Sequence, residues 1–199
     1  MSFSGGILIG SSISKKLSLQ SGISYSSSHI SIDPTKIYAV KVNAGDIKYR
    51  HNTSAGFSYI LPSFNLSPNI GDSLYTRASK HTLHYISIPL IIKYGFEHKR
   101  LSLNPGIGLA FNFLTKALLE TNINDGLNTE TESITKLEGL RKVSYSLMFT
   151  PELKYQVSKK WRIIAMPYFK YALASINKKN IVKTYPYNVG LGAGAVYKF

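Results

Sequence analysis

The chain has 199 residues, of which 44% are hydrophobic and 17% are charged, and its formal net charge at pH 7 is +14. This composition excludes a disordered chain, and the absence of cysteine excludes disulfides and thiolate metal sites. No apolar run reaches the roughly 18 residues of a membrane-spanning helix, and MSFSGGILIG lacks the basic start of a signal peptide. The positive charge predicts an anionic neighbour such as lipid, lipopolysaccharide or nucleic acid.

The predicted elements are seven β-strands, because apolar residues alternate with small or polar residues in each of them. The first is weak and rich in Gly and Ser, whereas the last, YNVGLGAGAVYKF, has the clearest alternation. In chain order the strands are 3–13, 17–25, 85–96, 101–113, 143–157, 161–173 and 187–199. About ten residues is the length that a tilted strand needs to cross a bilayer.

The connections between these strands alternate between short and long. SKKLSLQSGISY, HKRLSLNPGIGL and SKKWRIIAMPYF each begin with a basic turn and continue into a strand. The short turns are 13–17, 97–101 and 158–161, and the long connections are 28–82, 115–140 and 176–186. Short turns at one end and long loops at the other are typical of an outer-membrane barrel with periplasmic turns. The sequence therefore predicts one domain, 1–199, that forms an all-β, antiparallel, up-and-down transmembrane barrel.

A soluble barrel with an inward apolar face, such as a lipocalin-like carrier of an apolar ligand, is the alternative. Two features favour the membrane barrel. The second face is rich in Gly, Ser and Asn, as expected where side chains crowd a narrow interior. Aromatic residues near the strand ends would form a membrane-interface girdle: Tyr25, Tyr94, Phe96, Tyr155, Trp161, Tyr197 and Phe199.

Seven strands is an odd number, whereas bacterial single-chain barrels contain an even number. If the short turns are periplasmic, the chain starts outside and ends in the periplasm. We therefore expect an eight-stranded barrel whose first strand lies upstream of Met1. The alternative is a strand hidden in the first long loop, in IYAVKV (37–42) or SAGFSYIL (54–61).

Three segments carry a resemblance to a known family. YISIPLIIKYGF with LSLNPGIGLAFNFL (85–114), SGGILIGSSISKKLSLQSGISYS (4–26) and GLGAGAVYKF (190–199) resemble the outer-membrane β-barrel proteins of Gram-negative bacteria, which include porin-like and OmpA-like small barrels. The resemblance implies an eight-stranded antiparallel barrel, in which a further strand precedes the SGGILIG-like hairpin, and it supplies no functional residue. We also expect the barrel-assembly machinery to engage the C-terminal strand that ends at Phe199.

Five charged residues are expected to face the lumen as an ion-pair cluster: Lys93, Glu152, Lys154, Arg162 and Lys170. Glu152 is the acidic member, and a charge in a narrow lumen needs a partner. We therefore expect it to pair with one or more of the bases. The cluster is interpreted as a structural plug, and a narrow porin-like channel is the alternative.

The outer loops combine basic residues with tyrosines, and their bases are Lys36, Lys41, Lys48, Arg50, Arg77, Lys80, Lys178, Lys179 and Lys183. This mixture would also suit nucleic acid, but lipopolysaccharide phosphates are the simpler partner on an outer surface. The predicted function is a structural or surface-interaction role through these loops, with outer-membrane lipid and lipopolysaccharide as partners and no nucleic acid.

No residues form a catalytic or cofactor signature. The five histidines, His29, His51, His81, His84 and His98, lack metal-ligand spacing. GLGAG is followed by no helix, so it indicates strand packing rather than a dinucleotide loop. We therefore expect no enzyme activity, no metal and no cofactor.

Overall fold

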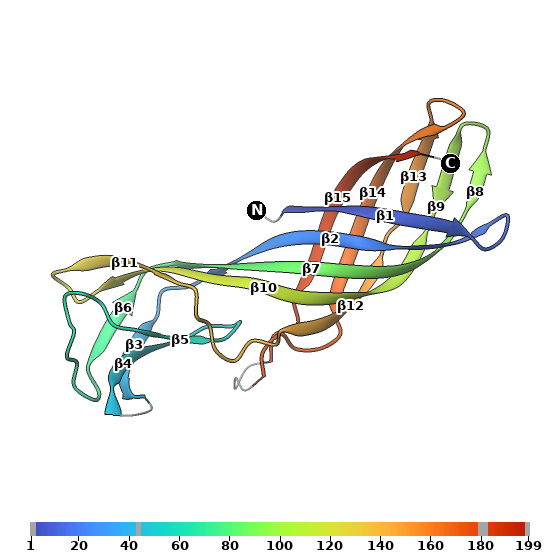
Figure 1. Ribbon diagram of the computed structural model, residues 1–199. Helices are drawn as coiled ribbons and strands as arrows, with labels where there is room; N and C mark the ends of the chain where they lie inside the picture. Colours follow the sequence, from blue (N-terminus) through green and yellow to red (C-terminus); the bar gives the residue numbers. More distant parts are fainter. Residues whose placement is uncertain (1–2, 43–44, 179–182, 198–199) are drawn as a thin grey trace.

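Antiparallel β-strands form nearly the whole molecule in the computed structural model, which describes residues 3–42, 45–178 and 183–197 (Figure 1). The strands are β1 (Phe3–Ser12), β2 (Leu17–Ile32), β3 (Lys36–Lys41), β4 (Ile47–Asn52), β5 (Phe57–Ile60), β6 (Ser73–Thr76), β7 (Ser79–Tyr94), β8 (Phe96–His98), β9 (Leu101–Asn104), β10 (Gly106–Asn124), β11 (Thr129–Ile134), β12 (Val143–Phe149), β13 (Glu152–Gln156), β14 (Trp161–Ala172) and β15 (Tyr187–Tyr197). The all-β antiparallel fold class is confirmed.

Seven of the strand paths form a curved wall, and they correspond to the seven predicted strands. The wall order is β1, β2, β7 with β8, β10 with β9, β12 with β13, β14 and β15. Three of these paths are interrupted, at Gly95, Pro105 and Pro151. Proline has no backbone N–H to donate to a neighbouring strand, and a proline lies at each of the last two breaks, although Pro89 and Pro167 lie within the continuous strands β7 and β14.

Period-two alternation places apolar side chains on the outer face of the wall. On the interior strands these outward side chains stay exposed, for example Leu147 at 37% and Ile107 at 57%. The inner face carries small or polar residues, of which Ser87, Asn112, Ser144 and Ser146 are buried. An apolar exterior around a packed polar interior is the reverse of a lipocalin-like carrier.

Two of the three short basic turns share a hydrogen-bonded design. In the first, the Ser14 hydroxyl accepts from the Leu17 N–H at 3.1 Å. In the third, the Ser158 hydroxyl accepts from the Trp161 N–H at the same distance. Serine hydroxyls commonly stabilise turns in this way, which accounts for the serine of the recurring SKK sequence. These turns define the turn rim of the wall, and the opposite end is the loop rim.

The first long connection is not a loop, and this corrects the prediction for 28–82. β2 continues to Ile32, β7 begins at Ser79, and β3 to β6 lie between them. Together with β11 and the outer end of β10 they form a lobe beyond the loop rim (Figure 1). The two candidate hidden segments do contain β3 and β5, but these strands pair with β4 and β6 instead of joining the wall.

A hydrophobic core of its own holds the lobe together. Its buried members are Ile37, Ala39, Tyr49, Ile60, Leu74 and Ile123. A second cluster, made of Ala55, Leu83, Ala117, Leu140 and Ile176, joins the lobe to the loop rim. Burial of such side chains is the main favourable term in folding, so the lobe is an ordered structural unit.

The wall does not close on itself within the described residues. β1 pairs with β2 and β15 pairs with β14, and no pairing joins β1 to β15. The odd number of wall strands predicted from the sequence is therefore present in the structure.

Replacement of Gly108 by alanine is expected to destabilise the wall by about 2 kcal/mol, because overpacking forces backbone shifts. A Cβ at this position would lie 2.1 Å from the Leu90 carbonyl oxygen in the neighbouring strand. Urea unfolding of the refolded variant in detergent measures the loss. Gly10→Ala is the control, because its Cβ would lie 3.7 Å from the nearest atom; an equal loss in both variants would contradict the steric explanation.

Candidate functional site: the lumen and the loop rim

Two buried charges, Lys93 and Glu152, and the partly buried Lys154 meet inside the wall near the turn rim. The Lys93 ammonium lies 2.6 Å from Oε2 of Glu152, and the Lys154 ammonium lies 2.7 Å from Oε1 of the same carboxylate. The side chains of Lys93 and Glu152 are 3% and 1% exposed. Buried charges are tolerated only when they are paired and hydrogen-bonded. Glu152 therefore pairs with two bases in the lumen.

The other two predicted members of the cluster lie elsewhere, so the five residues do not form one group. Arg162 is 3.6 Å from Glu97, which is exposed at the turn rim. Lys170 lies farther along the lumen and donates to Oδ1 of Asn112 at 2.6 Å. Alternation in the sequence places all five side chains on the inner face. Which of them form ion pairs depends on their positions along the barrel axis.

Asn112 organises this second polar layer. Its Oδ1 also accepts from the Ser87 hydroxyl at 2.8 Å, and its Nδ2 donates to the Ser146 hydroxyl at 2.9 Å. The layer therefore links strands β7, β10, β12 and β14 across the interior. Side chains fill the interior of small barrels in this way. Alternation in the sequence does not distinguish Asn112 from the other inward polar residues, so its role could not be predicted from the sequence.

Aromatic residues mark both ends of the outer face. Tyr94 and Phe96 have ring centroids 4.9 Å apart, and Trp161 and Tyr197 have centroids 5.2 Å apart. Together with Tyr155, these exposed side chains lie toward the turn rim. The predicted residue Phe199 lies outside the described residues.

Tyr25 belongs to the opposite end, where its hydroxyl is 2.5 Å from Nδ1 of His84. Three outward tyrosines that the prediction omitted accompany it toward the loop rim: Tyr145, Tyr171 and Tyr187. These tyrosines lie far in sequence from the short turns, and this distance could have identified them as residues of the opposite end. The structure thus has aromatic residues at two levels of the outer face, which is the arrangement expected at two membrane interfaces.

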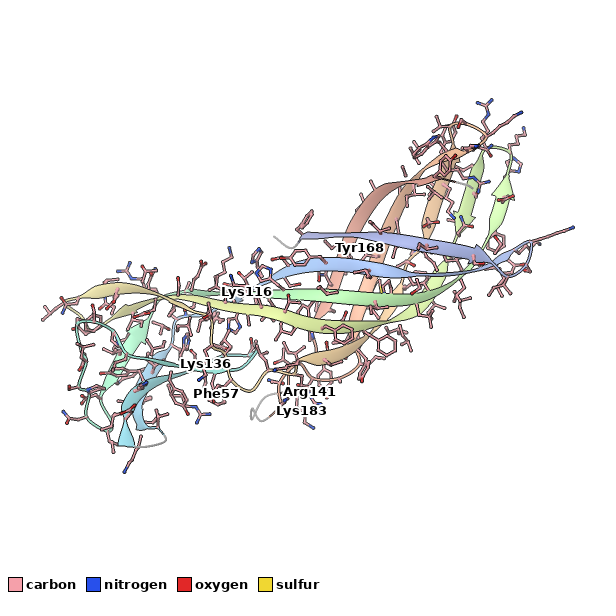
Figure 2. All side chains as sticks on the ribbon, in the orientation of Figure 1. Phe57, Lys116, Lys136, Arg141, Tyr168 and Lys183 are labelled. Carbon is pink, nitrogen blue, oxygen red and sulfur yellow. The ribbon has the colours of Figure 1, made fainter. Side chains whose placement is uncertain are left out.

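A group of exposed bases lies at the loop rim, between the lobe and the wall. We call it the rim cluster, and its members are Lys136, Arg141, Lys142, Lys178 and Lys183. Figure 2 labels Lys136, Arg141 and Lys183 in this region, beside Phe57 of the lobe. The bases predicted for the outer loops include Lys178 and Lys183 but not Lys136, Arg141 or Lys142, and the last two directly precede a predicted strand. Glu138 is an exposed acid within the same segment.

Backbone hydrogen bonds hold the segments of the rim cluster together. The Arg141 N–H donates to the Ile176 carbonyl at 2.8 Å, and the Lys178 N–H donates to the Gly139 carbonyl at 2.6 Å. The Asn177 side-chain amide donates to the Ser54 carbonyl in the lobe at 3.1 Å. Two outer connections that are distant in sequence are thereby fixed side by side.

The remaining outer surface has mixed charge, so the bases are not spread as one uniform patch. Three acids lie in the segment 33–84, namely Asp33, Asp46 and Asp72. Five more lie in 115–142: Glu120, Asp125, Glu130, Glu132 and Glu138. The segment 115–142 therefore has five acids and four bases, Lys116, Lys136, Arg141 and Lys142.

Comparison with known proteins identifies one matching protein family. A family model described as an outer membrane protein beta-barrel domain matches residues 1–156. The chain belongs to this family. No curated protein and no solved structure matches it.

As an outer membrane β-barrel domain, the chain is an integral outer-membrane protein, and its apolar outer face contacts lipid. In barrels of this kind the short turns are periplasmic, which is the orientation predicted from the sequence. No helix in the described residues is long and apolar enough to cross a membrane. Those residues also contain no group of three or more His, Cys, Asp or Glu side chains placed to bind a metal ion.

Proposed function

We propose that this protein has a non-catalytic, surface-interaction role in which the rim cluster binds the phosphate groups of lipopolysaccharide in the outer leaflet. The supporting observation is the position of the cluster. Arg141 and Lys142 directly precede Val143, the first residue of β12, and Lys183 precedes Tyr187, the first residue of β15. The bases therefore lie just beyond the outer tyrosines, which supports contact with lipid phosphates.

Electrostatics supports this ligand. A basic residue near an anionic lipid surface contributes about 1 kcal/mol to binding. The five cluster members outnumber the acid Glu138. Because hydrogen bonds fix the backbone of two connections beneath them, the side chains present their charges together instead of being dispersed on flexible loops.

The lobe is the second part of the proposed surface. Lys36 lies 5.5 Å from the ring centroids of both Tyr38 and Tyr75. Both tyrosines are more than half exposed. A cation held between two aromatic rings is a rigid, amphipathic contact surface. These residues support a role for the lobe in contacting an extracellular partner.

The triple variant R141Q/K142Q/K183Q is expected to bind lipid A roughly 100-fold more weakly, because about 1 kcal/mol is lost for each base. Binding is measured by titrating the detergent-folded protein with lipid A and, in parallel, with lipid A from which the phosphates have been removed. The native protein should prefer the phosphorylated form, and rising salt should weaken that preference through screening.

K15Q/K16Q/K159Q is the matched control, since it removes three charges from the turn rim. Its affinity for lipid A should remain that of the native protein. An equal loss of affinity in both triple variants would show that net charge, and not the rim cluster, is responsible. Equal binding of phosphorylated and dephosphorylated lipid A by the native protein would also contradict the proposal.

A further inference from the structure

We propose that the outward face of the lobe binds an acidic polypeptide, through two bases that are held against aromatic rings. We call this surface the lobe face. It lies on β3 to β6, and the side chains that define it are Lys36, Tyr38, Arg50, Phe57, Tyr59 and Tyr75. The inference rests on the proposed surface-interaction role, because it names the partner of the lobe, but it does not depend on the lipopolysaccharide site.

Strand register places the side chains of the lobe face beside one another. Tyr59 of β5 pairs with Arg50 of β4, and Arg50 pairs with Tyr38 of β3. Lys36, two residues before Tyr38, pairs with Tyr75 of β6. Side chains that are directly opposite on one face of a sheet are about 5 Å apart. The residues that alternate with them form the lobe core, so these side chains point away from the core as one continuous surface.

Two bases of the lobe face are held against aromatic rings. The Lys36 ammonium lies 5.5 Å from the ring centroids of both Tyr38 and Tyr75. The Arg50 guanidinium lies 4.3 Å from the ring centroid of Phe57. Attraction between a cation and the face of a ring holds both bases in position. Bases that are already positioned lose less side-chain freedom when a partner binds.

The charge on the lobe face has one sign. The strands β3 to β6 contain no Asp or Glu. Asp46 lies in the turn between β3 and β4, where it is 4.0 Å from Lys48. Across the described part of the chain, neither Lys36 nor Arg50 forms a salt bridge. Charge complementarity therefore favours an acidic partner, which would supply the missing carboxylates.

The types of side chain on the lobe face favour a polypeptide as that partner. Tyrosine, phenylalanine and arginine are enriched in protein–protein interfaces, and tyrosine is the main contact residue of surfaces that recognise other proteins. Tyr38 and Tyr75 are 51% and 60% exposed. Their hydroxyls can donate hydrogen bonds to carboxylates on either side of Lys36.

A single-stranded nucleic acid or a glycan fits the same face less well. Nucleic-acid bases, for example, stack on the faces of aromatic side chains. On the lobe face a cation already lies over the rings of Tyr38, Tyr75 and Phe57. Tyr59 packs against Phe57 with ring centroids 5.7 Å apart. The rings therefore support the bases, and the groups presented to a partner are ammonium, guanidinium and hydroxyl groups, which bind carboxylates.

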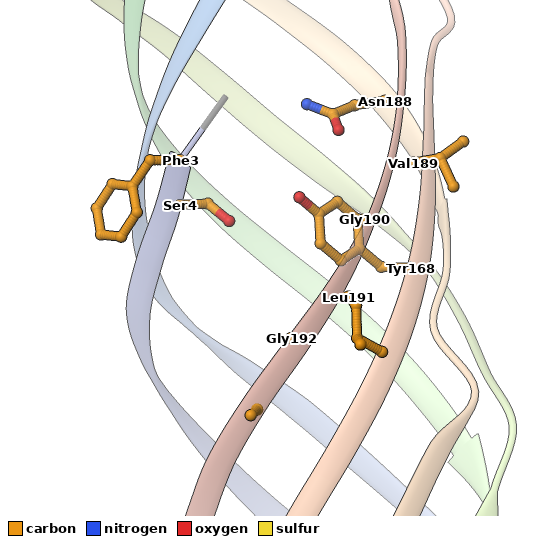
Figure 3. Close-up of a pocket in the computed structure, with 9 residues that line it drawn as sticks. Phe3, Ser4, Tyr168, Asn188, Val189, Gly190, Leu191 and Gly192 are labelled. Atoms are coloured by element: carbon orange, nitrogen blue, oxygen red, sulfur yellow. The ribbon is translucent and has the colours of Figure 1, made fainter. Parts of the chain in front are cut away.

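The cavity in the wall is not an alternative site for an acidic partner. This cavity has a volume of about 490 Å³ and lies among Ser4, Tyr168 and Asn188 (Figure 3). None of the residues that line it is charged. The lobe face, in contrast, carries unpaired bases and belongs to the part of the molecule that projects beyond the loop rim (Figure 1).

Binding is tested by titrating fluorescently labelled poly-L-glutamate with the detergent-folded full chain at neutral pH. A peptide of about ten residues is long enough to cross four strands that are about 4.8 Å apart. K36Q/R50Q is expected to bind this peptide about tenfold more weakly, because it loses two exposed ion pairs. Y38F/Y75F keeps both rings over Lys36 but loses two hydroxyl donors, and it should bind about threefold more weakly. Unboiled gels show that each variant is folded.

R141Q/K142Q is the matched control, because it removes one arginine and one lysine from the rim cluster. It should bind poly-L-glutamate like the native protein and lipid A more weakly, and K36Q/R50Q should show the reverse. A control that keeps its affinity for lipid A would contradict the proposed lipopolysaccharide site and leave the lobe inference standing.

Four results would overturn the lobe inference itself. The first is no binding of poly-L-glutamate by the native protein. The second is an equal loss of peptide binding in K36Q/R50Q and R141Q/K142Q, which would assign binding to net charge. The third is an unchanged affinity in either lobe variant. The fourth is tighter binding of polygalacturonate or of an oligothymidylate than of poly-L-glutamate, which would assign the face to a glycan or to a nucleic acid.

Discussion

Replacement of Glu152 by glutamine is expected to lower the free energy of unfolding by about 3–5 kcal/mol, the usual cost of breaking a buried ion pair by removing one partner. Glutamine keeps the shape of the side chain but removes the charge that faces both Lys93 and Lys154. The ammonium of Lys93, which is almost completely buried, would then have no counter-ion. Urea unfolding of the refolded protein, followed by the fluorescence of Trp161, measures the change.

Glu97→Gln is the matched control, because Glu97 is exposed and its ion pair with Arg162 is 3.6 Å long. Exposed pairs contribute about 1 kcal/mol or less, so this variant should be nearly as stable as the native protein. K93M/E152Q should recover part of the stability that E152Q loses, since no fully buried ammonium remains. Similar stabilities of E152Q and the native protein would show that the triad is not needed to hold the wall together.

Acidification from pH 7 to pH 4 is expected to loosen the lobe while the wall stays folded. Burial lowers the pKa of His51 and of His81 from the ordinary 6.5 to about 4. Within the described structure, no ring nitrogen of either residue has a hydrogen-bond partner. Both histidines are completely buried, His51 in β4 of the lobe and His81 near it at the outer end of β7, so a charge there would be unsolvated.

Proton binding determines whether the lobe becomes more or less stable as the pH falls. Between pH 6.5 and pH 4 the unfolded lobe binds protons at these histidines and the folded lobe does not, so lobe stability falls as the pH falls through this range. The loss is about 3 kcal/mol for each histidine once the pH reaches about 4. Hydrogen exchange in β3 to β6, corrected for the intrinsic effect of pH, should rise more than exchange in β14.

H51F/H81F tests whether these two residues are responsible, because phenylalanine retains a ring but cannot be protonated. This variant should show no selective loss of protection in the lobe at pH 4. His98→Asn, at the exposed turn rim, should behave like the native protein. If the lobe of H51F/H81F loosens as much as that of the native protein, other groups control its acid sensitivity.

The sequence by itself determined the wall strands, their two faces and the turns between them. Strand identity comes from period-two alternation, which is a local property, as in the residues on both sides of the turn at Ser158. The turn is local too, because a serine hydroxyl reaches an N–H three residues later. The inward position of Glu152 and the outward position of Trp161 follow from the same alternation.

Only the tertiary structure decided which distant groups meet. Alternation put Lys93, Arg162 and Lys170 on the inner face, but strand register placed Lys93 at Glu152 and the other two at different heights. The first long connection contains short strands whose apolar residues are buried only when β3, β4 and β6 pair. The rim cluster depends on contacts between 138–141 and 176–178. Such pairings join residues far apart in the chain, and local periodicity carries no information about them.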